Sequence, residues 1–181
     1  MVGGQRFLYY RHMDEIILEP PNPDWPRAFE REKADLLKLL PKNDVVTVHH
    51  FGSTAVPNLP AKPIIDILIE VTDMEKARSS FSVLMERAGY DFWRDNPKLD
   101  RLYFVKGRPP KGKKRTHHVH VGAVGGELSS RLLFRDFLIK NPEWRDRFAA
   151  LKLQLAKEFA QDREAYTDAK SDFVSLVMTR V

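Results

Sequence analysis

The sequence of 181 residues contains no cysteine. This absence excludes a disulfide framework, a thiolate zinc site and a cysteine nucleophile, and it suits a reducing cytoplasm. No apolar run approaches the roughly 18 residues that a membrane span requires. The first ten residues also lack the apolar core and the small-residue cleavage site of a signal peptide. We therefore expect a soluble cytoplasmic protein whose chemistry depends on oxygen and nitrogen groups.

Hydrophobic residues make up 43% of the chain, which includes three tryptophans. A chain of this length and composition can bury a sizeable core. We expect a single domain over residues 14–181, preceded by a leader of uncertain relevance over residues 1–13. Met13 is an alternative start.

The excess positive charge of the chain is concentrated in residues 106–115. The formal net charge is +5, and this stretch holds six basic residues and no acid: Lys106, Arg108, Lys111, Lys113, Lys114 and Arg115. Its prolines and glycines predict a loop. Such a loop is either a solvated hairpin tip or a contact for a phosphate-bearing partner. A nucleic-acid-binding module is the weaker interpretation, because no recognised motif accompanies the loop and no aromatic residues are interleaved with its charges.

The hydrophobic pattern predicts alternating helices and strands. Asp24 and Pro26 begin a helix that ends before Pro41, and the capping-box sequence 72–75 begins a second helix that Gly89 closes. Strands are predicted over residues 16–18, 45–51, 64–71, 90–94, 101–106 and 116–122, and further helices over 128–140, 143–159 and 163–178. This order predicts an α+β fold with a mostly central sheet, flanking helices and a C-terminal helical cap.

One stretch carries the strongest chemical signal. A strand breaks at Gly52 and Ser53, a short connection contains Lys62, and a second strand carries Asp66 among apolar residues. An unpaired carboxylate on an apolar strand is costly, so Asp66 is expected to bind a metal, a cation or a hydrogen-bonding partner. Ser53 has no histidine and carboxylate in an order that would activate it as a nucleophile. A turn that offers backbone N–H groups to phosphate explains the Gly-Ser pair better.

Several segments in order give the chain a family resemblance. They are Pro23-Asp24-Trp25-Pro26, His50-Phe51-Gly52-Ser53-Thr54-Ala55-Val56-Pro57, Ala61-Lys62-Pro63-Ile64-Ile65-Asp66-Ile67, Arg115-Thr116-His117-His118-Val119-His120, Leu133-Phe134-Arg135-Asp136-Phe137-Leu138 and residues 163–173. From about Ile16 onward the chain resembles the GrpB-like family of the nucleotidyltransferase superfamily. The resemblance implies a nucleotidyltransferase-like mixed sheet, and a Gly-Ser turn that positions a triphosphate. A GrpB-like extension also occurs on some dephospho-CoA kinases, which points toward coenzyme A or nucleotide metabolism.

The resemblance also implies a magnesium site of two carboxylates at alternate positions of one strand. In this chain the position after Asp66 on that face is Leu68. Glu70 is the next residue on the face, about 13 Å away at about 3.3 Å per residue, which is too far to share an ion. The expected two-metal mechanism therefore lacks a ligand, and the metal site is degenerate.

The resemblance implies a third carboxylate on a neighbouring strand, and two histidines could lie in its place. His118 and His120 share one strand face and would form an Asp-His-His cluster with Asp66 if the two strands are neighbours. Such a cluster suits a divalent metal such as Mn or Zn better than Mg. Asp66, His118 and His120 are thus candidate catalytic and metal-binding residues. Alternatively, the histidines donate hydrogen bonds to Asp66 or bind a phosphate.

Basic and small residues complete the predicted substrate site: Gly52, Ser53, Lys62, Arg115, Arg135, Tyr166 and Lys170. Tyr166 and Lys170 share one face of the predicted last helix with Arg163. The leading hypothesis is a protein that binds a nucleotide or another phosphorylated small molecule, and that transfers a nucleotidyl group if it is an active enzyme. The alternatives are a metal-dependent phosphoester hydrolase or transferase, and a nucleic-acid-binding module that uses the loop 106–115.

Overall fold

One mixed sheet of five strands organises the structure. The computed structural model describes residues 15–181, so the expected leader and the alternative start lie outside the described residues. The strands are β1 (Val45–Phe51), β2 (Ile65–Val71), β3 (Tyr90–Phe92), β4 (Arg101–Lys106) and β5 (His117–Ala123). Their order in the sheet is β1-β2-β5-β4-β3. Among the strands of the described residues, only the β2–β5 pair is parallel. The predicted α+β class and mixed sheet are confirmed.

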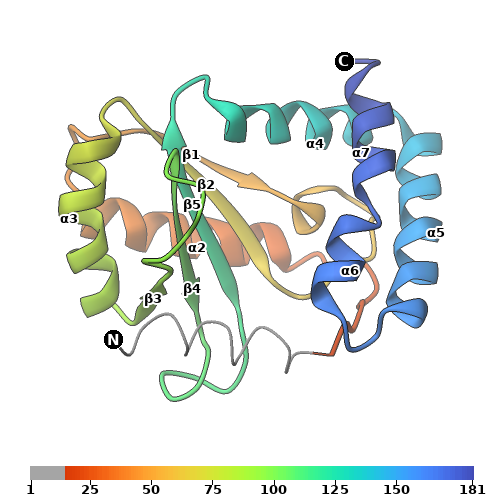
Figure 1. Ribbon diagram of the computed structural model, residues 1–181, viewed down its shortest axis with the longest axis horizontal. Coiled ribbons are helices and arrows are strands. Elements are labelled where there is room, and N and C mark those ends of the chain that lie inside the picture. Colours follow the sequence, from red (N-terminus) through yellow and green to blue (C-terminus); the bar gives the residue numbers. More distant parts are fainter. Residues whose placement is uncertain (1–14) are drawn as a thin grey trace.

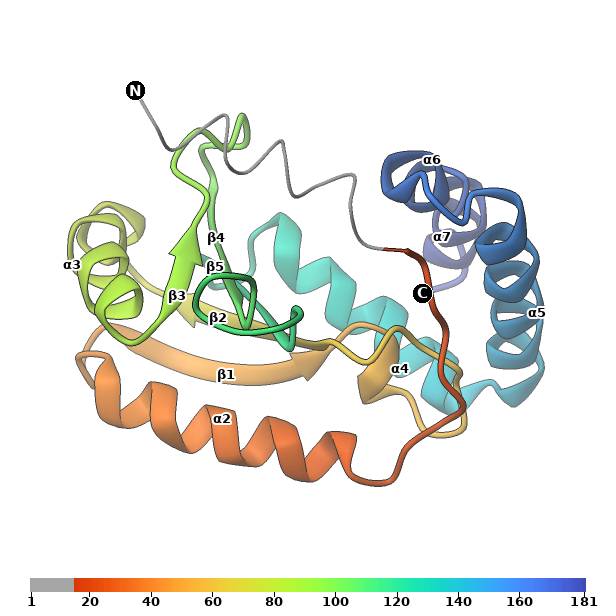
Figure 2. The ribbon, with the colours of Figure 1, turned by 90° about the horizontal axis from the view of Figure 1, so that it is seen from below.

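One face of the sheet forms the main core. Alternate residues of β2 (Ile65, Ile67, Ile69 and Val71) point to this face. They pack against α2 (Trp25–Leu39) and α3 (Met74–Arg87), whose apolar side chains include Phe29, Leu36, Phe81 and Met85. Figure 2 shows α2 running alongside β1 and α3 standing beside β3. This side of the sheet is therefore structural.

The other face is covered near one end by four C-terminal helices. They are α4 (Ser130–Lys140), α5 (Pro142–Glu158), α6 (Arg163–Asp168) and α7 (Ser171–Met178), and α5, α6 and α7 gather at one end of the molecule (Figure 1). A second apolar cluster holds them to the turn after β1, through Val56, Leu59, Leu138 and Phe148. The predicted helical cap is thus present. In the described part of the chain, no helix is long and apolar enough to cross a membrane.

Two local predictions were wrong. Residues 16–18 form no strand, and Glu19 makes only an isolated bridge with Ala61. The last helix is not continuous over 163–178, because α6 ends at Asp168 and α7 begins at Ser171. Arg163 and Lys170 therefore do not lie on one face of a single helix.

Candidate functional site

Gly52 lets the end of β1 approach Asp66 closely. Its φ angle is +70°, in the region that favours glycine. A Cβ atom at this position would lie 2.3 Å from Asp66 Oδ2. The next residues, Ser53–Ala55, form a single 3-10 turn. The predicted Gly-Ser turn thus places Ser53 beside the strand that carries Asp66.

Asp66 and His118 form a hydrogen-bonded pair across β2 and β5. The two residues are opposite one another in the parallel register, and His118 Nδ1 lies 3.0 Å from Asp66 Oδ1. Burial pushes the pKa of Asp66 upward, but the hydrogen bond and nearby positive charge outweigh burial, so this pKa lies below its usual value. Burial also holds the pKa of His118 below its usual value, despite Asp66. In this geometry His118 Nδ1–H donates to the Asp66 carboxylate, which the lowered pKa of Asp66 favours.

His120 lies beside this pair but is held among aromatic rings. Its ring centroid is 4.7 Å from that of Tyr103 and 5.2 Å from that of Phe51. Burial, and then the charge of Arg131, lowers the pKa of His120 to about 3, so it is neutral. Within residues 15–181, His120 Nδ1 and His118 Nε2 are buried and make no hydrogen bond. As expected, the strand that carries His118 and His120 lies beside the strand that carries Asp66.

The side chains that could coordinate a metal in this region do not fit the two-carboxylate magnesium site of the superfamily. Leu68 is fully buried in an apolar cluster with Phe51 and Leu128. Glu70 is already bonded to His49 at 3.0 Å and to Ser129 at 2.5 Å. The Asp66–His118 contact leaves no space for an ion between its two atoms. In the described residues, no group of three or more histidine or acidic side chains is arranged to hold a metal ion.

A large cavity opens above Asp66, between the sheet and the C-terminal helices. Its volume is about 880 Å³. Basic side chains dominate its charged lining: Lys62, Lys98, Arg101, Arg115, Arg131, Arg135, Lys152, Arg163 and Lys170. The acids of the lining are Asp66 and Asp168. The structure therefore gathers all seven predicted substrate-site residues, together with Asp66, His118 and His120, around one cationic cavity.

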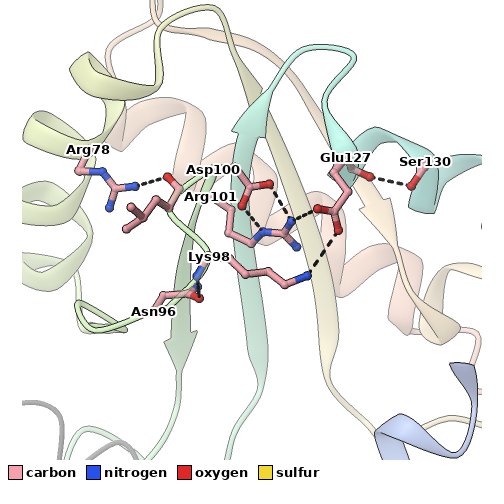
Figure 3. A network of polar contacts seen from close by, with 8 residues as sticks. Arg78, Asn96, Lys98, Asp100, Arg101, Glu127 and Ser130 are labelled. Carbon is pink, nitrogen blue, oxygen red and sulfur yellow. Dashed lines mark hydrogen bonds and ion pairs between the residues drawn. The ribbon is translucent and has the colours of Figure 1, made fainter.

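Some of the cavity cations already have acidic partners. Arg135 pairs with Asp136 at 2.7 Å and donates to the His50 carbonyl at 2.6 Å. At the rim, Arg101 pairs with Asp100 and Glu127, each at 2.8 Å, as Figure 3 shows. Lys98 in the same network lies 3.6 Å from Glu127. These contacts neutralise the rim and fix the loop between β3 and β4.

Three lysines deeper in the site form no ion pair within the described residues: Lys62, Lys152 and Lys170. Lys62 and Lys170 lie against the buried Tyr166 ring, 4.8 and 4.0 Å from its centroid. Burial, then repulsion from Arg163 and Lys170, lowers the pKa of Lys62 to about 7, although Asp66 acts in the opposite direction. Burial, and then Lys170, lowers the pKa of Lys152 to about 7. Burial lowers the pKa of Lys170 to about 8, although Asp66 acts in the opposite direction.

Sequence reasoning missed Lys152, which is 2% exposed and donates to Ser53 Oγ at 3.0 Å. A signal for it existed in the sequence. Lys152 stands at helical spacing between Phe148 and Leu155, both buried, in the apolar stripe of α5. A lysine within such a stripe is seldom fully buried unless its amine has a polar or charged partner.

The basic loop is less exposed than its sequence predicts. Lys106 contacts both carboxylate oxygens of Glu32 at 2.7 Å. Arg108 and Lys111 lie 3.3 and 3.1 Å from Asp91. Arg115 is buried and lines the cavity. Much of the positive charge of the loop is therefore neutralised by distant acids or directed into the site.

Comparison with known proteins agrees with this architecture. The GrpB protein family matches residues 15–180. The chain is similar to a UPF0157 protein of Pseudomonas aeruginosa, with 41% identity over 92% of this chain and 68% of that protein. It is also similar to a dephospho-CoA kinase of Mycolicibacterium paratuberculosis, with 29% identity over 86% of this chain and 43% of the kinase.

A solved structure gives the same result for the fold. The crystal structure of conserved protein GrpB from Enterococcus faecalis has a TM-score of 0.80 and 34% identity, and the match covers 91% of this chain and 96% of that one. Together, these matches show that the chain belongs to the GrpB family and has a nucleotidyltransferase-like fold.

Proposed function

We propose that the cavity binds a phosphorylated small molecule, either a nucleotide or another phosphate-bearing compound. The observation that carries this proposal is the cluster of Lys62, Lys152 and Lys170. These lysines come from three separate segments and converge beside the Gly-Ser turn without an acidic partner in the described residues. Buried ammonium groups are costly unless an opposite charge compensates them. An anionic ligand would provide that charge.

The shape and lining of the cavity support a small molecule with a polar and an apolar part. Its volume lies within the range of small-molecule sites. Apolar side chains such as Phe134, Leu138 and Met178 line the cavity together with the cations. Phosphate is the anion that such a cluster of lysines and arginines suits best.

Transfer chemistry has weaker support than binding. Leu68 occupies the position where a second metal-binding carboxylate would lie, so we derive no metal-dependent transfer step. The similarity to a dephospho-CoA kinase makes coenzyme A a reasonable probe, although this chain spans less than half of that kinase. Nucleic acid is a poorer candidate, because Lys106, Arg108 and Lys111 are paired with acids.

A matched panel of ligands tests this proposal by thermal shift. We expect ATP or coenzyme A to raise the melting temperature, and adenosine and pantetheine, which lack phosphate, to have little effect. A ligand at about 100 times its Kd adds roughly 2.7 kcal/mol of stability. For a chain of this size, that corresponds to roughly 5 to 10 °C. Equal shifts by the phosphorylated and phosphate-free members, or no shift by any member, would contradict phosphate binding.

A further inference from the structure

Ser53 and Lys152 form a contact that the phosphate-binding role does not require. Lys152 Nζ lies 3.0 Å from Ser53 Oγ and also contacts the carbonyl oxygen of Pro60. Ser53 is the first residue of the 3-10 turn, and Lys152 reaches it from the middle of α5. Both side chains line the cavity. A serine hydroxyl and a lysine amine thus meet at the wall of a ligand-sized space.

The surroundings of Lys152 favour its neutral form. The side chain is 2% exposed, and its amine lies 5.1 Å from the Phe148 ring centroid. The positive charge of Lys170 repels a proton on the Lys152 amine and so favours the neutral form further. In the ligand-free protein, burial and Lys170 bring the pKa of Lys152 to about 7. In the structure the Lys152 amine donates to both Ser53 Oγ and the Pro60 carbonyl. Once the amine is neutral, it can keep the N–H donated to Pro60 and accept the Ser53 O–H with its lone pair.

We propose that Ser53 is a nucleophile activated by Lys152 as general base, and that the pair cleaves an activated acyl group, an ester or a thioester. Activation of serine requires only a base within hydrogen-bond reach, and lysine in an apolar site can fill that role. The absence of a histidine partner in the sequence therefore does not exclude a nucleophilic Ser53. The partly exposed apolar side chains of Phe134, Val174 and Met178 line the same cavity and offer a surface to an acyl chain.

The proposed reaction balances with water as its co-reactant. Ser53 Oγ forms a bond to the acyl carbon, and its proton passes to Lys152 Nζ. The bond from that carbon to the leaving oxygen or sulfur breaks, and Lys152 gives the proton to the leaving group. Water then attacks the acyl-serine and gives a proton to Lys152, which returns it to Ser53 Oγ as the carboxylic acid leaves.

Labelling of the full chain with a fluorophosphonate, which reacts with nucleophilic serines, tests this proposal. We expect one adduct, located on Ser53 by peptide mass spectrometry and absent from Ser53→Ala. The labelling rate of the wild type should rise with pH, with a midpoint near 7. It should fall at least about 100-fold in Lys152→Met, because a general base contributes about that much or more. Hydrolysis of 4-nitrophenyl butyrate should show the same pattern.

The Lys152→Arg variant separates a base from a structural cation. Arginine keeps the charge but remains protonated, so it cannot accept the Ser53 proton, and we expect the same loss of labelling. Ser79→Ala and Lys157→Met, which change exposed residues outside the cavity lining, serve as controls and should label Ser53 at the wild-type rate. Circular dichroism shows whether each variant is folded. No adduct on Ser53 in the folded wild type, or wild-type labelling in a folded Lys152 variant, would overturn the proposal.

Discussion

Replacing Gly52 with alanine is expected to lower the free energy of unfolding by about 2 to 5 kcal/mol, the sum of a left-handed backbone penalty and of overpacking. The φ angle of +70° causes the first cost. The second arises because the new Cβ would lie 2.3 Å from Asp66 Oδ2. Asp66 would have to move away from His118, so binding of phosphorylated ligands should weaken as well. Denaturant unfolding and the ligand panel measure the two effects.

Gly125 provides a matched control for this substitution. Its φ angle is +68°, but a Cβ added there would meet no atom within 4 Å. The Gly125→Ala variant should therefore lose only the backbone contribution, about 1 to 2 kcal/mol. Equal destabilisation by the two alanine variants would show that Asp66 does not require the close approach at Gly52.

Replacing Lys62 with methionine is expected to stabilise the ligand-free protein at pH 7 by about 1 to 3 kcal/mol, because the variant removes a half-buried, desolvated charge that forms no ion pair among the described residues. Methionine keeps the packing against the Tyr166 ring. The same variant should bind the phosphorylated ligand roughly 10- to 100-fold more weakly, the effect of one hydrogen bond to a charged group. The melting temperature measured by thermal unfolding should thus rise, whereas the ligand affinity measured by titration calorimetry should fall.

The pH dependence gives this prediction a second readout. The pKa of Lys62 is about 7 in the folded protein, compared with 10.5 for an ordinary lysine. At pH values between these two, the unfolded chain binds more protons than the folded one, so the stability of the wild type rises with pH. The difference in free energy of unfolding between Lys62→Met and the wild type should therefore narrow from pH 7 to pH 9.5. Lys157→Met, at an exposed position of α5, should change stability by no more than about 0.5 kcal/mol. A Lys62→Met variant that is less stable and binds ligand normally would contradict the account.

The sheet and the gathering of the candidate residues around one cavity were predictable from the sequence because both depend on local patterns. Alternation in β2 and the Gly-Ser turn placed Asp66 correctly on its strand, and family resemblance indicated that β5 lies nearby. The break between α6 and α7 was not predictable from helical periodicity, because apolar spacing continues through Ala169 and Phe173. The acids that pair with the basic loop come from α2 and β3, and only the tertiary fold brings Glu32 and Asp91 there.

The lysine cluster also depends on tertiary structure. Lys62, Lys152 and Lys170 are far apart in the sequence, and only Lys152, in the apolar stripe of α5, carries a local sign of burial. Their burial results from the packing of α5, α6 and α7 over the turn after β1. Ion-pair partners cannot be assigned from sequence at such separations, so the absence of acidic partners among residues 15–181 emerged only from the structure.

The central claim is that Lys62, Lys152 and Lys170 together bind a phosphate-bearing anion. Proton uptake on ligand binding tests this claim most directly. Titration calorimetry at pH 8, in buffers of different ionisation enthalpy, measures the protons exchanged when the most stabilising of ATP and coenzyme A binds. At this pH phosphate groups are already fully charged, since their second pKa is about 6. At pH 8, Lys62 and Lys152, with pKa values of about 7, are largely neutral, and Lys170, with a pKa of about 8, is about half neutral. All three should take up protons as the anion raises those values. The account predicts a net uptake that decreases in Lys62→Met, whereas binding without uptake, or with release of protons, would contradict it.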